Sequence, residues 1–330
     1  MICELILATA LMGVAPDSPK TLFKPDLFQT LVDPDCSYCH VEEKRAGDVL
    51  KSDDRVLAWI RGDHEGGAVP YRWFLAPYRV ISDTYGVFVY DPDAGFVRGW
   101  PASVDFRFHG WRNGIMTMRH KDGTLFDCLT GEAFDGPRKG ERLKPIPTIE
   151  TTWGSWSKLM PKSVAYEMKP QFRPMPLPSA VDLKSKSTRP APDPRLDPEA
   201  RVFGLVNDGK AAAWPSASFG SGVEIHRLAI GRDAATILHD GRTGTTAAYS
   251  SFTEGKTPRR VDLELDAGDE TAPFVDRTTG SRWSIAGRCV SGKSKGESLK
   301  WLPGVAVKWS AWAAAYPDTT LDPIPLSSPK

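Results

Sequence analysis

Residues 126–161 read FDCLTGEAFDGPRKGERLKPIPTIETTWGSWSKLMP, and residues 275–317 read VDRTTGSRWSIAGRCVSGKSKGESLKWLPGVAVKWSAWAAAYP. Three residues of the first stretch recur 149 positions later: Asp127, Thr130 and Gly131 match Asp276, Thr279 and Gly280. Seven more recur 156 positions later: Gly140, Glu141, Leu143, Pro147, Trp153, Trp156 and Pro161 match Gly296, Glu297, Leu299, Pro303, Trp309, Trp312 and Pro317. Two constant offsets predict a tandem duplication whose second copy has seven extra residues in one loop.

The repeat divides the chain into segments. A proline-rich stretch between the copies holds eight prolines and has no apolar periodicity, so it is expected to be an extended, exposed linker. The predicted organisation is a signal peptide at 1–15, an N-terminal segment at 16–55, a first repeat domain at 56–168, the linker at 169–200, a second repeat domain at 201–321 and a tail at 322–330.

Local patterns predict an α+β fold of mostly antiparallel β-sheet with short helices. The chain has 29 Gly and 28 Pro residues, a composition that favours short strands and turns. Strands are expected at 86–90, 105–109, 115–119, 234–238 and 260–265, and short helices at 153–159 and 309–315. Each predicted helix carries two tryptophans three positions apart, which lie on one face and are expected to pack in the core.

Charge and the N-terminus indicate the class of protein. Lys and Arg total 42 and Asp and Glu total 41, a net charge of +1 that argues against a broad nucleic-acid-binding surface. The N-terminus, MICELILATALMGVAPDS, has an apolar run too short to span a membrane as a helix, with small residues placed as at a signal-peptidase site. We expect export to the periplasm or outside the cell, with no integral membrane span after cleavage; a short buried helix is the alternative.

The repeated pattern resembles a bacterial family, the domain of unknown function 3179 (DUF3179). The resemblance rests on the GEAF…GP…G…L…P…W…W…P spacing from Gly131 to Pro161 and covers most of 56–168 and of 201–321. It implies a fold but no activity. Members of the family carry Tyr-Cys-Pro-Leu-Cys-Gly after a strand. Here residues 90–95 read YDPDAG and residues 239–244 read HDGRTG, so neither copy has the cysteine pair.

One short motif has a definite chemistry: Cys36, Cys39 and His40 form a Cys-x-x-Cys-His sequence. In c-type haem attachment two such thiols bond to the porphyrin and the histidine binds the iron. One helical turn over residues 36–40 would bring the three side chains to one face, and the residues 40–62 are expected to form the helix on which the site sits. A haem c site is therefore one of three hypotheses for these residues.

Two other hypotheses fit the same residues. A zinc or copper ion bound by Cys36, Cys39, His40 and His64 would also use thiolate and imidazole ligands. Alternatively, the two cysteines form a disulfide without a cofactor.

Two further patterns are candidates for chemical sites. Asp91 and Asp93 form an acid–base or cation-binding pair in a hydrolase hypothesis, although Asp, Pro and Gly also suit a turn. Residues 287–294, GRCVSGKS, fit the letters of a phosphate-binding loop, but Pro303 prevents a long helix after them, so no nucleotide is expected.

Three functions follow from the sequence. The first is an exported protein, non-catalytic in its repeats, with a redox, metal or haem site at residues 36–40. The second is a ligand-binding or structural module in which an aromatic surface between the repeats binds a ligand. The third is the hydrolase. The sequence names no partner protein.

Overall fold

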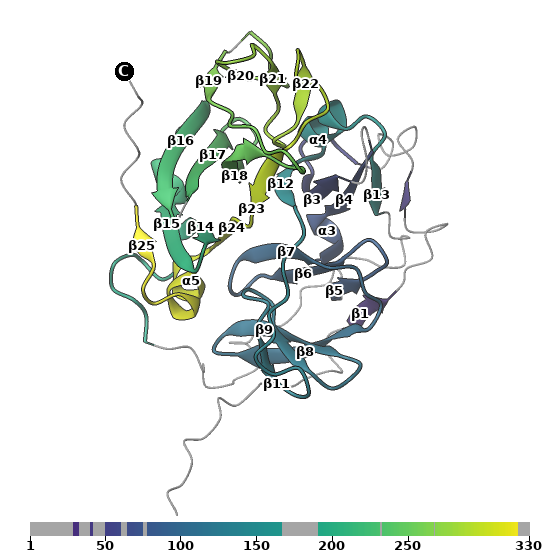
Figure 1. Ribbon diagram of the computed structural model, residues 1–330. Coiled ribbons are helices and arrows are strands. Elements are labelled where there is room, and N and C mark those ends of the chain that lie inside the picture. Colours follow the sequence, from purple (N-terminus) through teal and green to yellow (C-terminus); the bar gives the residue numbers. More distant parts are fainter. Residues whose placement is uncertain are drawn as a thin grey trace, which may run out of the picture.

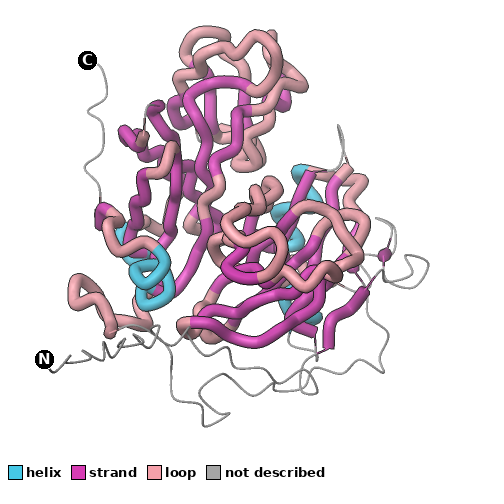
Figure 2. The backbone as a smooth tube through the Cα atoms, turned by 60° about the horizontal axis from the view of Figure 1, so that its bottom comes forward, coloured by secondary structure: helices cyan, strands magenta, loops and turns pink. Residues whose placement is uncertain are grey.

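Among the residues that the structure describes, strands are the predominant regular element, as the magenta trace in Figure 2 shows. The computed structural model describes residues 29–32, 40–41, 50–60, 65–74, 78–166, 191–231, 233–266 and 268–322. Most neighbouring strands pair antiparallel, and the helices are short. The expected fold class, α+β with mostly antiparallel sheet, is therefore confirmed.

The first half of the chain builds three sheets. One has the order β1 (Gln29–Val32), β5 (Tyr78–Ser82), β6 (Val87–Asp91), β7 (Phe96–Trp100). The next has the order β11 (Ala133–Asp135), β10 (Leu125–Asp127), β9 (Ile115–His120), β8 (Phe106–Arg112). The third has the order β12 (Ile149–Thr152), β3 (Arg55–Ile60), β4 (Gly66–Pro70), β13 (Val164–Tyr166), β2 (His40–Val41).

The second half builds three sheets of similar plan. One has the order β16 (Val223–Ile230), β17 (Asp233–Asp240), β18 (Thr245–Thr253), β23 (Leu299–Leu302). The next has the order β19 (Leu263–Leu265), β20 (Phe274–Asp276), β21 (Arg282–Trp283), β22 (Cys289–Ser291). The third has the order β24 (Val305–Lys308), β14 (Arg201–Asn207), β15 (Lys210–Pro215), β25 (Thr320–Leu321). The short helical segments of the two halves are α3 (Tyr71–Phe74), α4 (Trp153–Leu159), η2 (Ser216–Ser218) and α5 (Trp309–Ala315).

Helices α4 and α5 occupy the residues that the sequence predicts. The Oγ1 atom of Thr152 accepts a hydrogen bond from the backbone N–H of Ser155 and so caps the start of α4. The two tryptophans of each helix are buried, as their three-residue spacing requires: Trp153 and Trp156 in α4, Trp309 and Trp312 in α5. These tryptophans belong to the core.

The two halves also agree in strand register. In β3 and β12, Arg55 pairs with Thr152; in β14 and β24, Arg201 pairs with Lys308. Strands β13 and β25 each run parallel to the second strand of the neighbouring hairpin, β4 and β15 respectively. Strands β6 and β7 pair in the same register as β17 and β18, 149 positions later. Matched registers of this kind are what a tandem duplication predicts.

The halves interlock reciprocally. Strand β24 packs against β7 of the first half, and the corresponding strand β12 packs against β18 of the second. Trp309 and Trp312 share one hydrophobic core with Trp100 and Trp111, while Trp156 lies in a core that includes Ala286. In Figure 1 the sheet β8–β11 and the sheet β19–β22 consequently lie at opposite ends of the molecule.

Part of the predicted linker is attached to the second half. Residues 167–190 lie outside the described residues, but 191–200 are described. Arg195 donates a hydrogen bond to the carbonyl of Thr319 at 2.7 Å, and the indole N–H of Trp309 donates to the carbonyl of Asp193 at 3.2 Å. Residues 191–200 are therefore docked rather than free, and the domain boundaries stay predictions.

The N-terminal residues 1–28, including the predicted signal peptide, and the tail after residue 322 lie outside the described residues. Within the described residues, no helix has the length and apolar character needed to cross a membrane.

Candidate functional site

Most of the sequence-predicted cofactor site lies outside the described residues. Cys36, Cys39 and His64 are not among them, and only the backbone of His40 is described. His40 begins β2, which pairs antiparallel with β13. The expectation of a helix at His40 is therefore wrong, because this pairing requires an extended backbone. Within the described part of the chain, no group of three His, Cys, Asp or Glu side chains is placed to bind a metal.

Asp91 organises a turn. Its side chain is fully buried, and its Oδ1 atom accepts hydrogen bonds from the backbone N–H groups of Asp93 and Ala94, each at 3.0 Å. Its Oδ2 atom accepts a third from the N–H of Met116 at 2.8 Å. A carboxylate held by three backbone donors fixes the turn and the start of β9.

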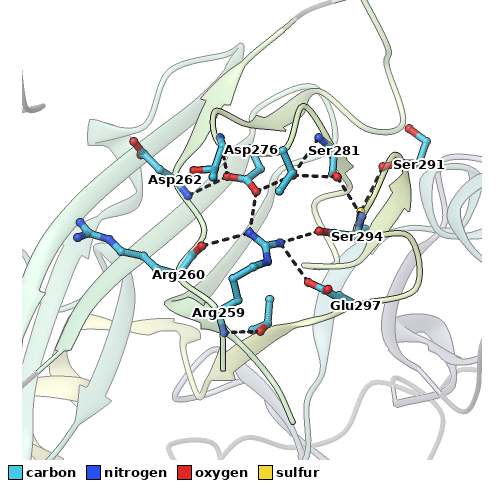
Figure 3. Close-up of polar contacts among 12 residues, drawn as sticks. Arg259, Arg260, Asp262, Asp276, Ser281, Ser291, Ser294 and Glu297 are labelled. Atoms are coloured by element: carbon cyan, nitrogen blue, oxygen red, sulfur yellow. Dashed lines mark hydrogen bonds and ion pairs between the residues drawn. The ribbon is translucent and has the colours of Figure 1, made fainter. Parts of the chain in front are cut away.

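The stretch 287–294 also has a structural role. It forms β22 and a turn, and the next element is another strand, β23, rather than the helix that a phosphate-binding loop requires. Figure 3 shows Arg259 reaching into this turn, where its guanidinium binds Asp276, Ser294 and Glu297 at 2.8, 2.7 and 3.1 Å. The backbone N–H of Ser294 donates to Ser281 Oγ at 3.1 Å.

The central cavity lies where β3 and β14 meet. It has a volume of about 280 Å³, and Arg55, Arg201 and Glu150 are among the residues that line it. The hydroxyl of Tyr71 donates to Glu150 Oε2 at 2.5 Å. Burial raises the pKa of Glu150, opposed by this hydrogen bond and by the two arginines. The central cavity thus holds one buried carboxylate among cations, and Arg98 also lines it.

A larger cavity lies between the halves and is lined mainly by rings. We call it the aromatic cavity. Its volume is about 400 Å³. The first half contributes Ala58, Trp59, Ile60, Tyr85, Ile146, Pro147, Ile149 and Trp156, and the second half contributes Tyr249, Glu254, Ala286, Ser298, Leu299 and Trp301. The sequence predicted an aromatic surface between the repeats, and this cavity matches that description.

The rings of the aromatic cavity are held firmly. Trp59 packs on Phe88 with ring centroids 4.4 Å apart, and the hydroxyl of Tyr249 donates to the carbonyl of Ile285 at 2.9 Å. At the rim, the backbone N–H of Glu254 donates to the carbonyl of Ser298 at 2.8 Å. The lining residues, all within the described part of the chain, include no Cys, His, Lys or Arg. Such a lining suits stacking and apolar contact rather than acid–base or nucleophilic chemistry.

Sequence reasoning identified Trp156 only as a core residue of the repeat and missed the other large rings of this cavity. Two of these rings could have been found by comparing the two repeats, because each stands where the other copy has a residue that is not aromatic. Trp301 stands 156 positions after Pro145, and Trp59 stands in β3 where the matching register of β14 has Leu205. Aromatic residues gained in one copy only would have pointed to a site that the duplication alone does not explain.

Comparison with known proteins identifies a family but no activity. The profile of the family described as "Protein of unknown function (DUF3179)" matches residues 111–319, which is more than half of the chain. No curated protein and no solved structure matches the chain. The match runs from β8 through α5 as one range, so it includes parts of both halves and begins later than residue 56, where the resemblance in the sequence starts. The chain belongs to the DUF3179 family.

Proposed function

We propose that this protein is a binding module that holds a small, uncharged, planar molecule in the aromatic cavity. The observation that carries the proposal is the ring-lined space of about 400 Å³ between the two halves. Binding sites for small molecules are commonly clefts of roughly 300–1,000 Å³ lined by apolar and aromatic side chains. Trp59, Tyr249 and Trp301 supply ring faces, and the rim residues Glu254 and Ser298 supply polar contacts.

The position of the cavity supports the proposal. Because each half contributes part of the lining, the site exists only when the halves are docked. The rings belong to strands or pack on buried neighbours, so little side-chain entropy is lost when a ligand binds. A flat, apolar ligand would gain contact with these ring faces without leaving a buried charge unpaired.

The test is a titration with the neutral fluorescent probe N-phenyl-1-naphthylamine. Saturable binding to the full-length protein is expected. Trp301→Ala removes one ring face and should weaken binding about tenfold or more, since a stacked aromatic pair contributes around 1 kcal/mol beyond its buried area. Ala286→Leu, which fills the cavity without removing a ring, should also weaken binding.

A matched control is available in the other half. Pro145 stands at the position corresponding to Trp301 and does not line the aromatic cavity. Pro145→Ala should leave the affinity for the probe within about twofold of wild type, because it removes no part of the lining. Unchanged binding in both Trp301→Ala and Ala286→Leu, or no saturable binding to the wild type, would exclude this function.

A second candidate function rests on the Cys-x-x-Cys-His motif. We propose that Cys36, Cys39 and His40 bind haem c or a transition metal ion, with His64 as a further ligand in the metal case. The candidate rests on the motif itself; the pairing of β2 with β13 attaches the backbone of His40 to the first half but does not supply the helical turn expected for the site. A disulfide between the two cysteines remains the cofactor-free alternative.

A visible spectrum and a metal analysis of one sample separate these cases. The protein should be made in a periplasmic host with haem-maturation machinery. A Soret band that the Cys36→Ala/Cys39→Ala variant lacks supports haem, and a stoichiometric metal that the variant lacks supports a metal site. The absence of both in the wild type rejects this second candidate.

Export is a proposal as well. It rests on the apolar run at residues 5–14 and the small residues after it, which are typical of a signal peptide. N-terminal sequencing of the protein from a periplasmic fraction should find a start close to residue 16. Retention of the full N-terminus in the cytoplasm would contradict it.

A further inference from the structure

A second cavity between the halves corresponds to the aromatic cavity in position but not in chemistry. We call it the basic cavity. Its volume is about 220 Å³, and it is lined by Arg98, Thr130, Arg142, Leu143, Lys144, Pro145, Val206, Pro303, Trp312 and Tyr316. Trp312, Pro303 and Leu143 correspond to Trp156, Pro147 and Leu299 of the aromatic cavity, at the repeat offset of 156. The duplication thus places one cavity at each junction between the halves.

Arg98 is the central cation of the basic cavity. The residue is only 8% exposed, and its guanidinium donates to the carbonyls of Leu129 and Pro303 at 3.0 and 3.1 Å. Its Nε has no hydrogen-bond partner, and no described carboxylate forms an ion pair with it. The direct partners of this buried guanidinium are therefore neutral carbonyls, Asp127 acts on its charge only through space, and one N–H donor stays unused.

The rest of the lining adds positive charge and no negative charge. Arg142 and Lys144 are exposed at the rim, and no Asp or Glu is among the lining residues, all of which are described. Arg142 is paired with Glu132, which lies outside the cavity lining, at 3.2 Å. The field in the cavity is therefore set mainly by cations, which attract a small anion.

An apolar, aromatic wall accompanies these charges. Trp312 is almost fully buried, and its ring centroid lies 4.4 Å from that of Tyr316. The indole N–H of Trp312 is bonded to Thr319 Oγ1 at 2.9 Å, which fixes the ring. A ligand held at Arg98 would have this pair of rings beside it.

The charge is specific to one cavity. The position of Arg98 in β7 corresponds to Ala247 in β18, and that of Arg142 corresponds to Ser298. Only Lys144 has a basic counterpart, Lys300. The two cavities share a backbone plan, but only one of them carries a buried guanidinium.

We propose that the basic cavity binds a small organic anion, a carboxylate or phosphate ester with an aromatic or branched apolar group. The anionic group pairs with Arg98 and lies toward Lys144 at the rim, and the apolar group packs on Trp312 and Tyr316. This site is separate from the aromatic cavity and takes a ligand of opposite character. It does not depend on the function proposed above.

The experiment is a calorimetric titration of the full-length protein with phenylacetate, phenyl phosphate, inorganic phosphate and the neutral phenylacetamide. Phenylacetate or phenyl phosphate should bind, and phenylacetamide should bind at least about tenfold more weakly, because a charge-assisted hydrogen bond contributes roughly 1.5–3 kcal/mol. The relative affinities of the carboxylate and phosphate probes identify the headgroup.

Variants assign the binding to this cavity. Arg98→Met keeps much of the length of the side chain and removes the charge, and should weaken anion binding by about tenfold or more. Lys144→Ala should weaken it about two- to fivefold, whereas the matched variant Lys300→Ala, at the corresponding position of the other half, should bind as wild type. Circular dichroism and thermal unfolding establish that each variant is folded.

Three results would overturn the proposal. One is that none of the anionic probes binds the wild type. Another is that phenylacetamide binds as well as phenylacetate. The third is anion binding unchanged in Arg98→Met; if that variant does not fold, unchanged binding in Lys144→Ala together with no dependence of the affinity on salt has the same meaning.

Discussion

Arg55 in β3 and Arg201 in β14 hold the same register position in their sheets, and each donates a hydrogen bond across to the opposite half. Arg55 Nη1 donates to the carbonyl of Thr243 at 2.5 Å, and Arg201 Nη1 donates to the carbonyl of Gly95. The acceptors lie in corresponding turns, which follow β6 and β17. Two equivalent arginines therefore join the halves in a reciprocal manner.

We predict that Arg55→Ala and Arg201→Ala each lower the free energy of unfolding by about 1–2 kcal/mol, because each leaves a carbonyl at the junction without its charged donor. Urea denaturation of the full-length protein measures the change. Lys300→Ala, an exposed substitution, serves as control and should change stability by less than about 0.5 kcal/mol. Equal stability of both arginine variants and the control would show that the contacts do not hold the halves together.

Gly131 and Gly287, which stand 156 positions apart and whose carbonyls accept from Leu143 and Leu299 respectively, offer a second test of how the halves are built. Both have positive φ, and a Cβ atom would lie 2.6 Å from the Trp100 ring at Gly131 and 2.3 Å from the Tyr249 ring at Gly287. Gly131→Ala and Gly287→Ala should each lower the free energy of unfolding by about 2 kcal/mol or more, from backbone strain and overpacking together.

The matched controls are Gly140→Ala and Gly296→Ala. These glycines also have positive φ, but a Cβ atom at either position would have no neighbour within 4 Å. They should lose only about 1 kcal/mol, the backbone part of the effect. If all four variants lost the same stability in thermal unfolding, the close approach of the rings would not matter.

The Arg259 network predicts a pH dependence. Asp276 is fully buried and accepts from Arg259 and from Thr279 Oγ1, the latter at 2.7 Å. Burial alone would raise the pKa of Asp276, but the hydrogen bonds from Thr279 and Arg259 outweigh it and hold the pKa below its ordinary value. An acid with a lowered pKa stabilises the fold above the pKa of the unfolded chain and loses this effect as pH falls through the folded value.

Comparison of the wild type with Asp276→Asn tests whether the stability contributed by Asp276 falls as the pH falls. The wild type should be more stable at pH 7, and the difference should shrink below about pH 4, where the unfolded carboxyl begins to bind protons. Chemical denaturation at a series of pH values measures it. A difference that is constant from about pH 7 to about pH 3, or that grows on acidification, would contradict the assignment.

Because residues 191–200 are docked on the second half, the expected protease site narrows from the whole linker, 169–200, to its first part. Arg195 and Trp309 attach that segment to the second half, so limited digestion should cut first within 169–190 rather than after Arg195. Mass spectrometry of early fragments locates the cut. First cleavage inside α4, β12 or β3 would count against the proposed boundary.

Local features were predictable and long-range ones were not. The bounds of helices α4 and α5 could be predicted to the residue, because the tryptophan spacing and the following proline act over one or two turns. The strand expected at 260–265 was too long, since β19 starts only at Leu263. The pairing of β12 with β3, about 90 residues apart, depends on tertiary contacts that no local pattern encodes.

The candidate sites show the same limit. The repeat offsets identified corresponding positions, but not that Trp156 would face residues of the second copy and Trp312 residues of the first. Arg98 has no distinctive signal in the sequence because its importance depends on burial without a carboxylate partner, and burial is known only once the halves are docked.

The most direct measurement of the central claim is an anomalous diffraction map from crystals soaked in 5-bromoindole, a neutral planar molecule. We predict a bromine peak inside the aromatic cavity, in contact with Trp59, Tyr249 or Trp301. Soaked crystals of Trp301→Ala should show that peak weakened or lost. A map with no peak in the aromatic cavity, or with bromine only at other places on the molecule, would contradict the proposed function.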